Sequence, residues 1–272
     1  MRHATSAIHR PAAIAAVLVA LFGIGWFGRD LLVGGTEQEA AARGPLKVRL
    51  ADRTVKAGAA APLSFRIEDP EGHPLRSFEV AHEKRLHMIL VRRDLSGFQH
   101  VHPTMAADGT WSIPVRFKDP GPHRLFADFK AAGKARVLHA DLTVDGEYAP
   151  QDLPGPTDTA TAPGGYAVRL SRAGEETVFH VRHNGKRVRD LEPYLGARGH
   201  LVALREGDLA YLHVHPTSKA TQGGDIRFIV SYPDFGGYRL FLQFKHGGRV
   251  HTTAFTQIPD VDAAEDGADH EH

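Results

Sequence analysis

The feature that most constrains the fold of this chain is an internal duplication. The pentapeptide His-Val-His-Pro-Thr occupies residues 100–104 and again residues 213–217. A further histidine, His87 or His200, stands at the same distance before each copy. The similarity continues downstream, where residues 121–129 resemble residues 236–244. The chain therefore contains two copies of one unit, and each copy has the length of a small domain.

The duplication divides the chain into six segments. The repeats are expected at residues 46–147 and 165–259, and a linker rich in Pro, Gly and Thr separates them at 148–164. Residues 1–35 form an apolar N-terminal segment, residues 36–45 a short juxtamembrane linker, and residues 260–272 an acidic tail that contains histidine.

The N-terminal segment predicts export. Arg2 and Arg10 precede an apolar run at 12–28, whose length lies between that of a signal-peptide core and that of a spanning helix. Positive residues on this side favour a cytoplasmic N-terminus. An uncleaved anchor would give a single-pass protein of the cell membrane that contacts the lipid bilayer through its N-terminal helix. A cleaved signal would give a secreted protein. Both alternatives place the repeats outside the cytoplasm.

The pattern within each repeat predicts short strands. Residues 63–67 alternate apolar and polar side chains, residues 69–72 read as a turn, and Asp108-Gly109 reads as a hairpin turn. Six or seven such strands per repeat indicate an immunoglobulin-like β-sandwich. The expected fold is all-β, with two tandem sandwiches after the N-terminal helix.

Composition narrows the chemistry. The formal net charge of +1 gives no electrostatic case for nucleic acid. The chain has no cysteine and three methionines but 18 histidines. A site for a transition metal must therefore be built mainly from imidazole, the commonest protein ligand for such ions.

The histidines of each repeat have the spacing of a metal site. Residues two apart in a strand point to the same side, so His100 and His102 share one face. A hairpin centred at Leu95 and Ser96 would pair Val91 with His100 and bring His87 diagonal to His102. Three imidazoles suit zinc or copper. The predicted ligands are His87, His100, His102 and His139 in the first repeat and His200, His213, His215 and His251 in the second, with His139 and His251 as fourth ligands.

Two alternatives stay open. If Val101 and Val214 face the core, the histidines could decorate a solvated face of a structural or protein-interaction module without metal. A one-residue register slip would also separate His87 from the pair. A cupin-like metalloenzyme is a weaker alternative, because Pro103 and Pro216 follow the motif and no carboxylate follows within a few residues. Other catalytic motifs are absent, so the chain is not expected to be an enzyme.

The first repeat also resembles a known family. The motifs are His82-Glu83-Lys84 with His87, residues 92–95, residues 98–103 and residues 108–111. They are similar to the exported bacterial YtkA-like or FixH-like immunoglobulin-type domains, some of which are described as heavy-metal-binding. The resemblance implies a sandwich fold, export and, more loosely, metal binding. The second repeat departs from the pattern, with Leu195 in place of His82 and Gln243 in place of Asp128.

Together these patterns predict a membrane-tethered extracytoplasmic protein. Its strand histidines would coordinate a copper or zinc ion for sequestration, delivery or tolerance. Its partners would be the metal ion, the lipid bilayer and a metal-transport or envelope protein.

Overall fold

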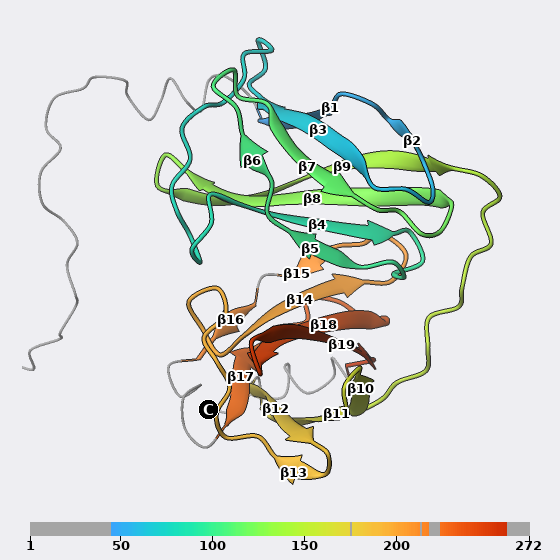
Figure 1. Cartoon of the computed structure of the whole chain (residues 1–272), viewed down its shortest axis with the longest axis vertical. Coiled ribbons are helices and arrows are strands. Elements are labelled where there is room, and N and C mark those ends of the chain that lie inside the picture. The colour runs from blue at the N-terminus through green and yellow to red at the C-terminus, as the bar shows by residue number, and fades with distance from the viewer. Residues whose placement is uncertain (1–44, 175, 213, 218–223, 260–272) are drawn as a thin grey trace, which may run out of the picture. The chain divides into compact units, whose positions relative to one another are not determined.

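The computed structural model describes residues 45–174, 176–212, 214–217 and 224–259 (Figure 1). The expected N-terminal helix within residues 1–35, nearly all of the linker 36–45 and the tail 260–272 lie outside these residues. Among the described residues, the structure contains no helix with the length and apolar character needed to span a bilayer.

The first repeat confirms the all-β expectation with two sheets. The outer sheet has the strand order β1-β3-β7-β6, with bounds β1 Lys47–Leu50, β3 Ala61–Glu68, β7 Trp111–Val115 and β6 Thr104–Met105. The inner sheet has the order β2-β9-β8-β4-β5, with bounds β2 Thr54–Lys56, β9 Lys134–Asp145, β8 Gly121–Ala131, β4 Leu86–Arg92 and β5 Gln99–Val101.

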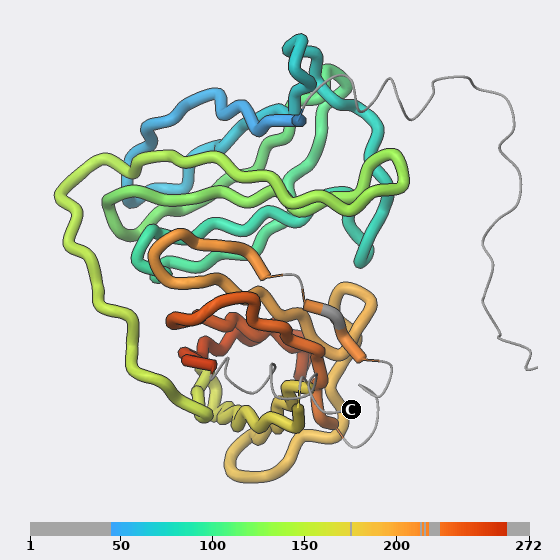
Figure 2. The backbone as a smooth tube through the Cα atoms, turned by 180° about the vertical axis from the view of Figure 1, so that it is seen from behind, coloured from blue at the N-terminus to red at the C-terminus, as the bar shows by residue number. Residues whose placement is uncertain are grey.

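The second repeat repeats this arrangement. Its outer sheet has the order β10-β11-β12-β17-β16 with β13 paired to β12, and the bounds are β10 Thr159–Ala162, β11 Tyr166–Ala173, β12 Glu176–His183, β13 Lys186–Arg187, β16 His215–Pro216 and β17 Asp225–Ile229. Its inner sheet has the order β15-β14-β18-β19, with bounds β14 Gly199–Arg205, β15 Tyr211–Leu212, β18 Tyr238–His246 and β19 Arg249–Gln257. The fold is therefore two tandem β-sandwiches, joined by the segment between β9 and β10 that Figure 2 traces from one repeat to the other.

Each sandwich encloses its own core. In the first repeat, Leu86, Met88 and Leu90 of β4 pack with Phe65 and Trp111 of the outer sheet. The second repeat has a matching cluster, in which the even-numbered β18 residues from 240 to 244 pack with Phe179 and Phe228. Both cores follow from the period-two alternation of strands, because every second side chain faces the opposite sheet.

The inner sheets bury their other faces against each other. Ile89, Val91 and Phe126 of the first repeat form one apolar cluster with Val202 and Phe241 of the second. We call this the inter-repeat cluster; its other buried members are Leu95, Leu204 and Leu209. As a result every residue of β4 is buried. The two repeats therefore belong to one compact unit, Arg43–His272.

The hairpin that joins β4 to β5 corrects the expected register. Ile89, rather than Val91, pairs with His100, and Met88 pairs with Val101. In the connection, the backbone N–H of Arg92 donates to the carbonyl oxygen of Ser96, and Leu95 and Gly97 have positive φ, 64° and 65°, so the chain turns about Asp94 rather than between Leu95 and Ser96. The error is two residues, which equals the side-chain period of a strand. The histidines consequently keep the face that was predicted for them.

Candidate metal centre

Three elements of the first repeat and one of the second bring histidines together at the inter-repeat face. His87 lies on β4 and His100 on β5, while His102 follows β5 at the point where the chain leaves the inner sheet for β6 in the outer sheet. His200 lies on β14 of the second repeat. Val101 packs against the core between these histidines, as the metal-free alternative required. The face opposite Val101 is not the solvated surface of that alternative, because it meets the other repeat.

The ring of His87 is held by a backbone carbonyl. The ring is buried, and its Nε2 lies 3.0 Å from the carbonyl oxygen of Ala81. A carbonyl only accepts hydrogen bonds, so Nε2 carries the proton and donates it. The other nitrogen, Nδ1, is therefore unprotonated in the neutral ring and presents its lone pair to His100 and His102.

His100 is oriented from the second repeat. Its Nδ1 lies 2.7 Å from Oε1 of Gln243, a residue on β18. The amide oxygen accepts the proton of Nδ1, which leaves Nε2 of His100 unprotonated. Partners of this kind fix the ring orientation of metal-binding histidines in other proteins.

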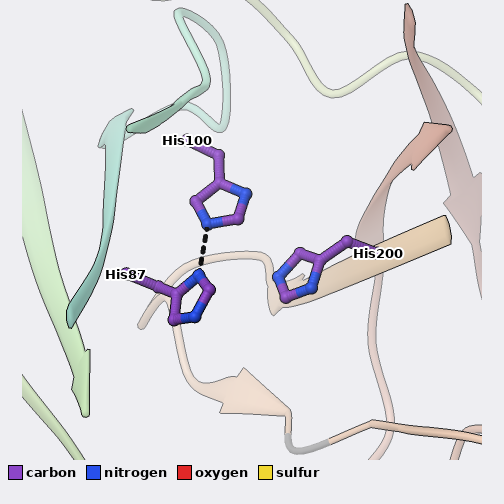
Figure 3. A group of neighbouring side chains, drawn as sticks. All are labelled: His87, His100 and His200. Atoms are coloured by element: carbon purple, nitrogen blue, oxygen red, sulfur yellow. Dashed lines mark hydrogen bonds between the residues drawn. The ribbon is translucent and has the colours of Figure 1, made fainter. Parts of the chain in front are cut away.

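The facing nitrogens have the spacing of ligands around one ion. Nδ1 of His87 lies 3.1 Å from Nε2 of His100 and 3.2 Å from Nε2 of His102 (Figure 3 shows the first pair). Nitrogens that each lie ~2.0–2.1 Å from a tetrahedral ion are about 3.3 Å apart. The His87–His100 and His87–His102 pairs therefore have the spacing of two ligands on one ion.

His200 adds a ring from the other repeat. Among the described residues, ligand atoms of His87, His100 and His200 all lie within 4.8 Å of one another. The His200 ring stacks on that of His100 at a centroid separation of 4.6 Å and is nearly parallel to that of His87 at 5.7 Å (Figure 3). Its buried Nε2 has no hydrogen-bond partner. Since buried polar atoms are rarely left unpaired, this nitrogen calls for an explanation.

The surroundings keep these rings uncharged near neutral pH. Burial lowers the pKa of His100 to about 3, and the neighbouring histidines act in the same direction. Burial likewise lowers the pKa of His102 to about 4, with a smaller contribution from His87 and Lys84. The pKa values of His87 and His200 also fall because of burial. Neutral imidazole is the form that binds metal.

The structure separates the two predicted fourth ligands from this cluster. His139 is exposed on β9, where it pairs with Phe126 and contacts its ring. His251 lies on β19 opposite Phe244, on the core side of the sheet, and its Nε2 approaches the carbonyl oxygen of His246. The two residues are not structural equivalents. The strand position that matches His139 is Ala254, which pairs with Phe241 as His139 pairs with Phe126.

The remaining second-repeat predictions fall outside what the structure describes. His213 is outside the described residues. His215 begins β16, but its side chain is also not described. The expected second set around His200 is therefore untested, whereas His200 itself lies beside the first set.

Gln243 is the residue of this candidate site that sequence reasoning missed. It appeared only as a departure from the pattern of the first repeat, where Asp128 occupies the same position. The pairing confirms that equivalence, because His87 pairs with Asp128 and His200 with Gln243. This difference between the copies was the available signal, and its meaning depends on the contact between repeats.

A second polar set, on the outer sheet of the second repeat, has the order of a hydrolytic triad. Ser171 Oγ lies 3.0 Å from His180 Nε2, and His180 Nδ1 lies 2.9 Å from Asp225 Oδ1. Arg187 donates to the same Asp225 oxygen at 2.7 Å, so that carboxylate already has a full positive partner. A triad also needs donors aimed at a developing oxyanion. Here β11, β12 and β17 are each paired on both sides. The set is best described as an ion-pair network on the sheet surface.

The fold and the cluster define a class: tandem β-sandwich proteins with a histidine cluster where the inner sheets meet. The chain belongs to the family described as "Domain of unknown function (DUF8832)", whose model matches residues 40–146 and again residues 161–261. No curated protein matches the chain.

The solved structures that match the chain have low sequence identity to it and low TM-scores. The Escherichia coli adhesin FdeC is 15% identical with a TM-score of 0.26, and the match covers 77% of this chain and 63% of that one. The Escherichia coli alpha-2-macroglobulin activated by porcine elastase is 12% identical with a TM-score of 0.28, covering 79% and 20%. Domains 5–6 of the S-layer protein SbsC are 13% identical with a TM-score of 0.22, covering 79% and 97%. The chain thus spans less than two thirds of the first two. Likeness this low carries no argument about function.

Proposed function

We propose that this protein binds a transition-metal ion, zinc or copper, through His87, His100 and His102, and that it is a binding protein rather than an enzyme. The observation that carries the proposal is the contact between Nδ1 of His87 and Nε2 of His100 at 3.1 Å. The outer nitrogens of both rings donate to oxygen atoms of Ala81 and Gln243. Two lone pairs therefore face each other, and this arrangement favours a cation between them.

A proton is a poor candidate for that cation near neutral pH, because burial disfavours the charged ring and holds the pKa of His100 at about 3. A metal ion avoids this cost, since it bonds directly to neutral imidazole. Nitrogen ligands without thiolate suit Zn(II) and Cu(II). The chain has no cysteine, which argues against a thiolate-based Cu(I) site.

The metal-free alternative is a closed hydrogen-bond network. If the side-chain amide of Gln243 is turned by half a rotation, its NH₂ group would donate to His100 Nδ1. The Nε2 proton of His100 could then point at His87. Amide orientation is assigned from such networks, so a titration with metal separates the two states. In this alternative the chain is an interaction module whose histidines only support the contact between repeats.

The cellular role remains part of the proposal. The apolar segment at residues 12–28 supports tethering to the membrane with the repeats outside the cytoplasm. There the protein would sequester the ion, deliver it to a metal-transport or envelope protein, or provide tolerance to it. The resemblance of the first repeat to YtkA-like and FixH-like domains supports the same role.

The test is calorimetric titration of the purified full-length chain in detergent with Zn(II) and with Cu(II). His270 and His272 are replaced by alanine throughout, so that the tail does not compete. We expect a dissociation constant well below ~100 μM, the value that corresponds to about −5.5 kcal/mol. His87→Ala and His100→Ala should each weaken binding by on the order of 100-fold or more, because each removes a ligand.

The matched control is His139→Ala, since His139 is exposed on β9 and lies apart from the cluster. It should leave the affinity unchanged. Binding weaker than ~100 μM in the parent chain, or equal affinity in the His87 and control variants, would refute the proposed function.

A further inference from the structure

We infer that the ion is shared between the two repeats, with His200 as its fourth ligand, so that the metal acts as a clasp between them. This inference rests on the proposed function and deepens it. It predicts one ion per chain at this face instead of one per repeat.

The position of His200 is the first support. Its ligand atom is within 4.8 Å of those of His87 and His100, although the residues belong to different repeats. Three histidines of the first repeat leave one position of a tetrahedral ion open. His200 is the nearest described ring from the second repeat, and a turn about its Cβ–Cγ bond would direct a nitrogen toward the ion.

The unpaired nitrogen is the second, independent support. Nε2 of His200 is buried and has no partner. Leaving such a group unsatisfied destabilises the folded state. A shared ion bound by Nε2 of His200 would give this nitrogen a partner.

The hydrogen bond of Gln243 is the third support. Gln243 belongs to the second repeat, yet it orients His100 of the first. Its amide nitrogen also donates to Thr252 on the neighbouring strand β19, which holds the side chain in place. The second repeat would thus supply both a ligand and the group that positions another ligand. Separation of the repeats would dismantle the site.

The experiment measures zinc binding and amide hydrogen exchange on the same full-length variants, again with His270 and His272 replaced. The parent chain should bind one Zn(II) at this face. His200→Ala and Gln243→Leu should each weaken zinc binding by about 10–100-fold. Zinc should slow exchange in both β4 and β14 of the parent chain. In His200→Ala, at zinc concentrations that saturate the variant, the slowing should persist in β4 and disappear in β14.

His200→Leu separates a ligand from a structural residue. It removes the unpaired nitrogen while keeping an apolar side chain at a buried position. In EDTA its melting temperature should equal or exceed that of the parent chain, and zinc should raise it less. A residue kept only for packing would show a loss in EDTA and no change in the effect of zinc.

The outcomes distinguish the two ideas. If the parent chain binds zinc, His87→Ala abolishes binding and His200→Ala binds as tightly as the parent with equal slowing in β14, the clasp is wrong and the proposed function stands. Two equivalent ions per chain at the repeats would also overturn the clasp. If the parent chain binds neither Zn(II) nor Cu(II), both ideas fail.

Discussion

Replacing Asp94 with alanine is expected to lower the free energy of unfolding by about 3–5 kcal/mol, because it leaves the buried guanidinium of Arg92 without its counterion. Arg92 and Asp94 form an ion pair whose side chains are only 3% and 5% exposed. The guanidinium donates to both carboxylate oxygens, at 3.0 and 2.6 Å. Asp94 also accepts hydrogen bonds from Ser96 and from the backbone N–H of Gln151 in the inter-repeat segment. One carboxylate therefore holds the β4–β5 hairpin and the start of the connection to the second repeat.

Urea unfolding of the variant and the parent chain measures this effect. Asp141→Ala is the matched control, since it also removes a carboxylate from an arginine, Arg124, but Asp141 is 58% exposed. Exposed pairs contribute about 0–1 kcal/mol. Equal losses in the two variants would show that burial of the Arg92–Asp94 pair has no energetic weight.

The same ion pair predicts a dependence on pH. Burial alone would raise the pKa of Asp94, but hydrogen bonds from Arg92 and Ser96 outweigh it and hold the pKa at about 2, below the ordinary value of 3.8. A carboxyl with a depressed folded pKa stabilises the fold above its unfolded pKa and loses this contribution as pH falls through its folded value. The stability difference between the parent chain and Asp94→Asn should thus be constant above pH ~4 and shrink toward pH ~2. A difference that stays constant down to pH ~2 would contradict this assignment.

Phe241→Ala is expected to have a comparable cost, about 3–5 kcal/mol, and to uncouple the repeats. Phe241 is 5% exposed and stacks on Phe98, which comes from the other repeat. The ring centroids are 4.0 Å apart and the planes differ by 6°. Removing this ring opens a cavity in the inter-repeat cluster, which packs the two inner sheets together.

Differential scanning calorimetry provides the measurement. The parent chain should unfold with the repeats coupled, whereas Phe241→Ala should unfold earlier and resolve two transitions. Phe235→Ala is the control, since Phe235 is 71% exposed and lies outside the inter-repeat cluster. An unchanged profile in Phe241→Ala would mean that the cluster does not couple the repeats.

The sequence predicted those features that depend on local alternation. The shared face of His87, His100 and His102 follows from period two, and it survived a register error because that error was itself two residues. The position of the turn caused the error: Arg92 hydrogen-bonds to Ser96 with Leu95 at positive φ, so the chain turns earlier than the expected centre at Leu95 and Ser96.

The contact between repeats could not be derived in the same way. Packing of two inner sheets depends on the whole shape of both sandwiches, so neither His200 beside His87 nor Gln243 on His100 follows from spacing. One local signal did exist. The residues of β4 form a nearly continuous apolar run, which is typical of strands buried on both faces. An alternating pattern would have been expected for a sheet with one face in water.

Each repeat uses the same face of its inner sheet for the contact with the other repeat. The contact therefore resembles the interface of a symmetric homodimer, although both halves belong to one chain. In a homodimer every substitution at such an interface appears twice, once on each partner. Within a single chain the two halves are free to differ, and Asp128 and Gln243 occupy equivalent strand positions with different side chains. Duplication followed by fusion thus provides a route by which one polypeptide can acquire an asymmetric coordination sphere that two identical subunits cannot build across their axis.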